Sequence, residues 1–154
     1  MKRIKQILFT LLILFIVIQF IRPARNHGEQ AGQLNIAATF NAPDTVLSLF
    51  RNACFDCHGN DTDYPWYSNI QPVGWLIEKD IRDGKAKLNF SELGSLSPRR
   101  QMSKWQNVEN RIKDGTMPLP MYQLMHPRAR LTEAERQRLI DWVRKTIDTL
   151  ASQR

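Results

Sequence analysis

Five consecutive residues, Cys54, Phe55, Asp56, Cys57 and His58, constrain this chain more than any other feature. They form the pattern Cys-x-x-Cys-His and include both of the chain's cysteines and one of its three histidines. Residues three apart on a helical turn lie on the same side, so two thiols in this spacing can reach two substituents of one flat ring. The adjacent histidine can then reach a metal at the centre of that ring. The pattern predicts covalent attachment of one haem c through both thiols, with His58 as an iron ligand.

Three alternative interpretations of the motif fit the sequence less well. A thioredoxin-like dithiol is expected beside a βαβ pattern, whereas the sequence around the motif is helical. A structural zinc site needs four ligands, and the two other histidines, His27 and His126, form no second pair with suitable spacing. A disulfide between Cys54 and Cys57 would leave His58 without a role.

The chain opens with a basic and then apolar segment. Three of the first five residues are basic, and the run from 7 to 21 is apolar apart from Thr10 and Gln19. Such a segment is either a signal peptide or a transmembrane anchor. The sequence that follows, Arg22-Pro23-Ala24-Arg25, lacks the small residues that a signal peptidase requires, which favours an uncleaved anchor over residues 1–24. In either case the basic residues stay cytoplasmic and the remaining chain is exported to the periplasm. The favoured anchor predicts a single-pass protein of the bacterial inner membrane with its soluble domain in the periplasm.

The positive net charge does not indicate a nucleic-acid-binding protein. Residues 34–154 hold 17 basic and 14 acidic side chains, so the excess is small outside the N-terminal segment. Because no strong basic stretch stands out, we expect no nucleic-acid partner. Residues 25–43 contain Gly28, Gly32 and Pro43 among polar residues and are predicted to be a linker, in which His27 is solvated.

Residues 44–154 are predicted to form one all-α domain. The first helix starts near Asp44 and continues through the motif, with both thiols on its inner face. Further helices are expected over residues 73–82, from Ser97 and Pro98 to Gly115, and after Thr132, which begins a capping box with Glu135. The closing helix is expected to cross the first one.

The loop over residues 60–72 is predicted to cover the haem. It contains Tyr64, Trp66 and Tyr67, and aromatic side chains pack well against a large apolar plate. The backbone carbonyl of Pro65 or Pro72 is expected to accept the Nδ1 proton of His58, since a ligating histidine is commonly oriented in this way.

A second segment, residues 115–127, supplies candidates for the sixth iron ligand. It holds three prolines, which predict an extended or turning backbone, and three of the five methionines. Met117 is the first candidate, because Gly115 frees the backbone before it and Pro118 restricts the backbone after it. The alternatives are His126, then Met121 or Met125, and an open or water-bound position.

Three stretches together resemble a known family. They are Cys54 to Tyr67 (CFDCHGNDTDYPWY), Leu88-Asn89-Phe90-Ser91, and Met117-Pro118 through His126-Pro127 to Trp142. These motifs, spanning about residues 45–145, resemble the bacterial haem-binding domain family, and the order of elements is similar to that of a class I monohaem cytochrome c. The resemblance implies a cytochrome c-like helical fold around one haem, with Cys54, Cys57 and His58 as the haem-binding residues. Met117 matches a Met-Pro position and His126 a His-Pro position, so both stay candidates for the sixth ligand.

We therefore expect a membrane-tethered periplasmic electron carrier that exchanges electrons with membrane or periplasmic redox proteins and is not an enzyme. The alternative is a peroxidase-like enzyme or a gas or redox sensor with an open or displaceable sixth site. A peroxidase would need a distal residue over the iron, for which His126 is the candidate.

Overall fold

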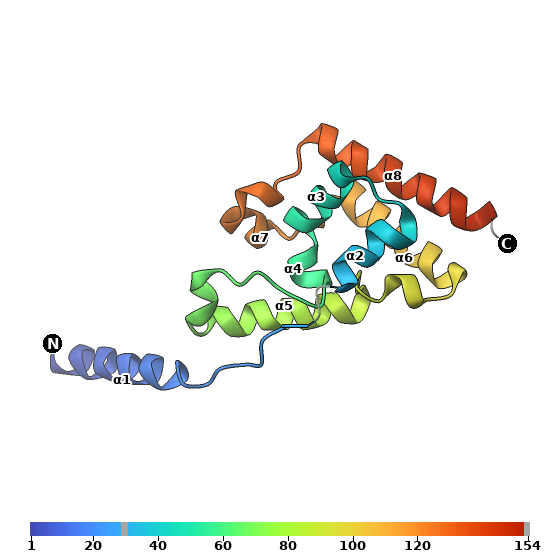
Figure 1. The fold of residues 1–154 in the computed structure, drawn as a ribbon. Coiled ribbons are helices and arrows are strands. Elements are labelled where there is room, and N and C mark those ends of the chain that lie inside the picture. The colour runs from blue at the N-terminus through green and yellow to red at the C-terminus, as the bar shows by residue number, and fades with distance from the viewer. Residues whose placement is uncertain (29–30, 153–154) are drawn as a thin grey trace.

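The computed structural model describes residues 1–28 and 31–152, and these form helices joined by loops (Figure 1). Within these ranges the β-structure consists of one isolated bridge between His27 and Asp61, which confirms the all-α fold class. The longer helices are α1 (Lys2–Ile18), α2 (Ala31–Phe40), α3 (Asp44–Ala53), α5 (Val73–Lys87), α6 (Pro98–Lys113) and α8 (Glu133–Ser152). The shorter ones are α4 (Phe55–His58), α7 (Pro120–Met125) and the 3-10 helices η1 (Trp66–Asn69), η2 (Leu93–Ser95) and η3 (Pro127–Ala129).

Helix α1 stands apart from the other helices (Figure 1). It has 17 residues, and its apolar side chains from Ile4 to Val17 are between 44% and 63% exposed. Among the described residues, no helix combines the length and the apolar character needed to cross a membrane. The predicted transmembrane anchor over residues 1–24 is therefore not supported.

The segment predicted as a linker is largely structured. Within residues 25–43, positions 31–40 form α2, and Ile36 on this helix is fully buried in the hydrophobic core. Gly28 and Pro43, which suggested a linker, therefore flank a helix that packs onto the domain, and Gly32 lies within that helix. Residues 29 and 30 lie outside the described part of the chain.

Phe50 of α3 stands at the centre of the core. Its ring contacts the rings of Phe55, Phe90, Trp105 and Trp142, with centroids 5.2 to 6.3 Å apart. Most of these contacts are edge-to-face, which is the favourable geometry for aromatic pairs. Because the five residues come from α3, α4, the loop after α5, α6 and α8, this cluster joins the elements around the Cys-x-x-Cys-His motif.

Helices α6 and α8 form the most extensive helix pair. The predicted starts of both are confirmed. Ser97 precedes Pro98 at the first turn of α6, and the Thr132 Oγ1 accepts a hydrogen bond from the Glu135 backbone while the Glu135 carboxylate accepts one from the Thr132 backbone. Gly115 after α6 has φ of +66°, a left-handed conformation that favours glycine. The closing helix also packs against α3, as expected.

Three helix boundaries differ from the sequence-based prediction. The first helix does not continue through the motif, because the backbone leaves the helical region at Cys54 (φ −132°), where α3 ends and α4 begins. Helix α5 continues past Gly84 to Lys87, since that glycine packs against α4. Residues 120–125 of the segment predicted to be non-helical form α7, with Pro120 at the first position, where a proline costs no hydrogen bond.

Glu109 gives the α6–α8 pair a testable electrostatic contribution. Its carboxylate pairs with Lys113 on α6 and with Arg144 Nε of α8 at 2.7 Å. The hydrogen bond from Lys113, together with that from Arg144, lowers the pKa of the Glu109 carboxyl. We expect Glu109→Gln to reduce the free energy of unfolding at pH 7 by about 0.5–1 kcal/mol.

The pH dependence follows from the direction of this pKa shift. A carboxyl with a lowered pKa in the folded state stabilises the fold above its unfolded pKa, about 4.3, and this contribution is lost as the pH falls through the folded value. The difference between wild type and Glu109→Gln in urea titrations should therefore be present at pH 7 and should shrink as the pH falls below about 4.3. Glu92→Gln, at an exposed position, is the control, and an unchanged difference over this pH range would contradict the assignment.

Candidate functional site

His58 is held by a hydrogen bond from its Nδ1 atom to the backbone carbonyl of Leu88, at 2.9 Å. A carbonyl oxygen only accepts, so Nδ1 carries the proton and Nε2 is left with a free lone pair. Burial lowers the pKa of the His58 imidazole, which keeps the ring neutral at neutral pH. The residue is thus prepared as a metal ligand through Nε2. The acceptor is Leu88, and the prediction of Pro65 or Pro72 was wrong.

A close approach between α4 and α5 makes this hydrogen bond possible. A Cβ atom at Gly84 would lie 2.7 Å from the backbone oxygen of Cys57 and 3.4 Å from the Cε1 atom of His58. The first distance is too short for any side chain, so α5 passes the motif at this distance only with glycine there. A second backbone contact, from the Phe90 N–H to the His58 carbonyl at 2.8 Å, fixes the chain just after Leu88.

The two thiols are half-buried and are not joined in a disulfide. Burial, the larger cause, and the neighbouring Cys57 raise the pKa of the Cys54 thiol to about 12. Burial, followed by Asp56 and Asp80, raises the pKa of the Cys57 thiol to about 12. A dithiol oxidoreductase needs a lowered cysteine pKa, so these thiols do not fit the thioredoxin-like alternative.

A cavity of about 370 Å³ opens beside Cys54, and we call it the Cys54 cavity. His58 and Met117 also line it. Its remaining lining includes apolar side chains from α6 and from the segment after α5, namely Val108, Ile112, Leu88 and Phe90.

A second cavity of about 210 Å³, the Cys57 cavity, is lined by Cys57 and again by His58 and Met117. Leu119, Pro118 and Tyr122 complete part of its wall. The structure therefore brings four of the predicted site residues, Cys54, Cys57, His58 and Met117, to one pair of adjoining cavities.

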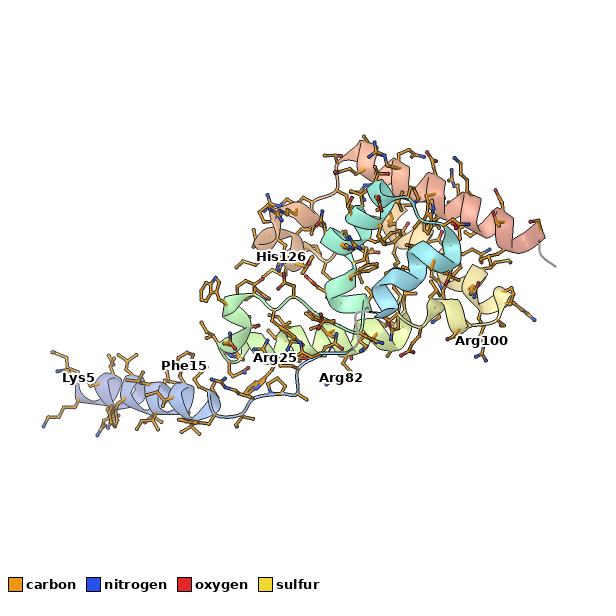
Figure 2. All side chains as sticks on the ribbon, in the orientation of Figure 1. Lys5, Phe15, Arg25, Arg82, Arg100 and His126 are labelled. Atoms are coloured by element: carbon orange, nitrogen blue, oxygen red, sulfur yellow. The ribbon has the colours of Figure 1, made fainter. Side chains whose placement is uncertain are left out.

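The other candidates for the sixth ligand lie elsewhere. His126, Met121 and Met125 line a third cavity of about 270 Å³, which touches Cys57 but is not lined by His58. His126 Nδ1 donates to the Tyr122 carbonyl at 3.0 Å, and Nε2 is 3.4 Å from the Tyr67 hydroxyl. Both ring nitrogens of His126 are thus engaged. His126 lies beside α7 (Figure 2).

The three aromatic residues of the loop over residues 60–72, which were predicted to cover the haem, lie in different surroundings. Tyr67 lines the third cavity, but Trp66 is 74% exposed and Tyr64 packs against Arg25 and Asn26. One aromatic residue of the three therefore adjoins the region around Cys57.

The residues around the Cys54 cavity fit a haem. A haem is an apolar plate with two carboxylates, and this cavity combines apolar walls with three cations, Lys87, Lys104 and Arg111. These three cations could hold the carboxylates of a bound haem, and Cys54, Cys57 and His58 would supply attachment and ligand groups for it. Within residues 1–28 and 31–152, no cluster of three or more His, Cys, Asp or Glu side chains is arranged to hold a metal ion, so the zinc alternative lacks its ligand set there.

Sequence reasoning missed several residues of this site. The Leu88 carbonyl and Gly84 act through the backbone, and the three cations come from α5 and α6 rather than from the motif. The short motif Leu88-Asn89-Phe90-Ser91 was the signal that could have indicated Leu88.

A comparison with protein families agrees with this geometry. The model of the haem-binding domain matches residues 13–145. The chain belongs to the haem-binding domain family. Neither a curated protein nor a solved structure matches the chain. The family match begins inside α1 and ends inside α8, so it includes the whole site described above.

Gly84→Ala tests the close approach of α5 to the motif. The added methyl group would collide with the Cys57 carbonyl and force α4 and α5 apart, which we expect to cost about 1–3 kcal/mol of stability and to lower the fraction of chains that hold haem. Alanine has a higher helix propensity than glycine, so a change in helix propensity alone would make Gly84→Ala more stable than the wild type.

The measurement is the haem absorbance per mole of purified protein together with the urea midpoint. Arg82→Ala, at an exposed position on the same helix, is the control. Full haem content and unchanged stability in Gly84→Ala would show that the close approach does not matter.

Proposed function

We propose that this haem-binding protein is a periplasmic c-type cytochrome that holds one haem covalently and carries single electrons. Cys54 and Cys57 attach the haem, His58 Nε2 is one iron ligand and Met117 is the other. The observation that carries the proposal is the position of Met117, which lines both cavities that His58 lines.

The haem supplies a one-electron couple when bound, and the chain's residues set its properties. The Leu88 carbonyl holds the Nδ1 proton of His58 and so raises the basicity of the ligating nitrogen. A thioether ligand from Met117 raises the reduction potential relative to a second histidine. Two protein ligands leave no coordination site for a substrate, which suits an electron carrier.

The location of the protein is part of the proposal. The exposed apolar side chains of α1 and the basic residues before them suit an export signal or an attachment to the membrane surface. We propose that residues 1–24 direct the domain to the periplasmic face of the inner membrane. There it would meet its redox partners, which are membrane or periplasmic proteins.

The catalytic or sensory alternative depends on an open sixth site. The distal histidine proposed for it, His126, has both ring nitrogens engaged by Tyr122 and Tyr67 and does not line the cavities of His58. The geometry therefore supports the carrier better.

Replacing both thiols tests covalent attachment. We expect the exported wild-type chain to keep haem after denaturing electrophoresis, seen by a haem stain, and Cys54→Ser/Cys57→Ser to lose it completely. A carbonate wash of the membrane fraction tests the location at the same time. A stain that persists in the double variant, or a colourless wild type, would contradict the proposal.

Met117→Ala tests the sixth ligand. We expect the ferric wild type to show the near-infrared band of methionine bound to iron, and the ferrous wild type not to bind carbon monoxide. Met117→Ala should lose the band and bind carbon monoxide, because the thioether no longer occupies the iron.

Met121→Ala and His126→Ala are the matched controls, since both residues line the third cavity, and they should behave like the wild type. A wild type with high-spin iron that binds carbon monoxide readily would favour the catalytic or sensory alternative. Loss of the near-infrared band in His126→Ala would assign the ligand to His126.

A further inference from the structure

Residues 19–28, which follow α1, run along the domain and are hydrogen-bonded to it at several points. We call residues 19–28 the N-terminal strap. Gln19 and Gln71 exchange two hydrogen bonds, from Gln19 Nε2 to the Gln71 carbonyl at 3.1 Å and from the Gln71 N–H to Gln19 Oε1 at 2.9 Å. The Trp75 Nε1 donates to the Ile21 carbonyl at 2.8 Å. The strap is therefore attached to the start of α5 before it reaches the haem motif.

Arg25 provides the next attachment and lies against the domain beside α5 (Figure 2). Its guanidinium donates to Ser68 Oγ at 2.8 Å and to Asn69 Oδ1 at 2.7 Å. It also lies over the ring of Tyr64, 4.1 Å from the centroid, in a cation–π contact.

Asn26 uses every one of its polar groups on residues around the motif. Its Nδ2 donates to the Gly59 carbonyl at 3.0 Å and to Thr62 Oγ1 at 2.8 Å, and its Oδ1 accepts from Lys85 Nζ at 2.7 Å. The backbone N–H of Asn26 donates to the Tyr64 hydroxyl at 2.7 Å. Its carbonyl accepts from the Thr62 N–H at 3.1 Å. In a surface linker these polar groups would be hydrogen-bonded to water, so this network indicates a specific role for Asn26.

The amide nitrogen and the amide oxygen of the Asn26 side chain bind the two elements that position His58. Gly59 directly follows His58, and Lys85 lies on α5 three residues before Leu88. Asn26 thus bridges the same two segments that the hydrogen bond from His58 Nδ1 to Leu88 joins. The strap backbone also passes close to the segment after the motif, because a Cβ atom at Gly28 would lie 2.8 Å from the Asn60 carbonyl oxygen.

The geometry points to Asn26 as a positioning residue that sets the hydrogen bond between His58 and Leu88, with the N-terminal strap as an integral part of the haem site. The inference rests on the proposed function and adds two consequences. Asn26 influences the reduction potential without touching the haem, and any removal of α1 during export takes place before the strap.

Asn26→Ala in the full haem-loaded chain tests the first consequence by potentiometric titration. A weaker hydrogen bond from His58 Nδ1 to the Leu88 carbonyl leaves less electron density on the imidazole. The imidazole then stabilises ferric iron less, so the reduction potential should rise. We expect about a tenfold change in the equilibrium constant for reduction, or about 59 mV. Asn110→Ala, at an exposed position on α6, is the matched control and should leave the potential unchanged.

A second variant covers the case in which Asn26→Ala does not accumulate. Asn26→Ser leaves the net charge unchanged and keeps a hydrogen-bonding group, but its side chain is too short to reach both Gly59 and Lys85, so it should shift the potential in the same direction by a smaller amount. An unchanged potential in the accumulated Asn26→Ala, or in Asn26→Ser, overturns the positioning role even if the protein is less stable. A wild type without haem would instead refute the proposed function.

The second consequence is tested on the exported wild-type protein by mass spectrometry of its N-terminus. We expect the mature chain to retain residues 19–28, whether or not α1 is removed. A mature chain that begins beyond Asn26 and holds haem with the same potential as the full chain overturns the inference.

Discussion

The hydrogen bond from His58 Nδ1 to the Leu88 carbonyl is the constraint on which the rest of the site depends. It fixes the tautomer, leaves Nε2 of a residue that lines both cavities with a free lone pair, and requires α5 to end next to the motif. That position in turn requires glycine at residue 84, where the α5 backbone passes the Cys57 carbonyl. The strap strengthens the same arrangement from outside, because Asn26 bridges Gly59 and Lys85.

The aromatic core holds the motif from the other side. Phe50 on α3 and Phe55 on α4 both contact Phe90, two residues after Leu88, so movement of the Leu88 carbonyl would disturb the core. Phe90 is 2% exposed and also lies 6.1 Å from the His58 ring. His58 is thus positioned by a packed core and a backbone acceptor together, which limits movement of its imidazole ring.

The sequence predicted what depends on side-chain pattern and missed what depends on backbone position. The fold class, α6 and the capping box of α8 follow from periodicity and capping residues, and these predictions are confirmed. The break at Cys54, the continuation of α5 through Gly84 and the Leu88 acceptor depend on how α4 and α5 meet, which a linear pattern does not contain. Residues 25–28 of the strap were predicted as part of a linker, because Asn26 and Arg25 look like ordinary polar residues until their partners, more than 30 positions away, are known.

Covalent haem is the central claim, and the tryptic peptide of residues 52–79 tests it most directly because it contains both cysteines and His58. The exported protein should yield this peptide with the mass of one haem added and no alkylatable thiol. A peptide of unmodified mass with two alkylatable thiols, or one that has lost only the two hydrogens of a disulfide, would contradict the account.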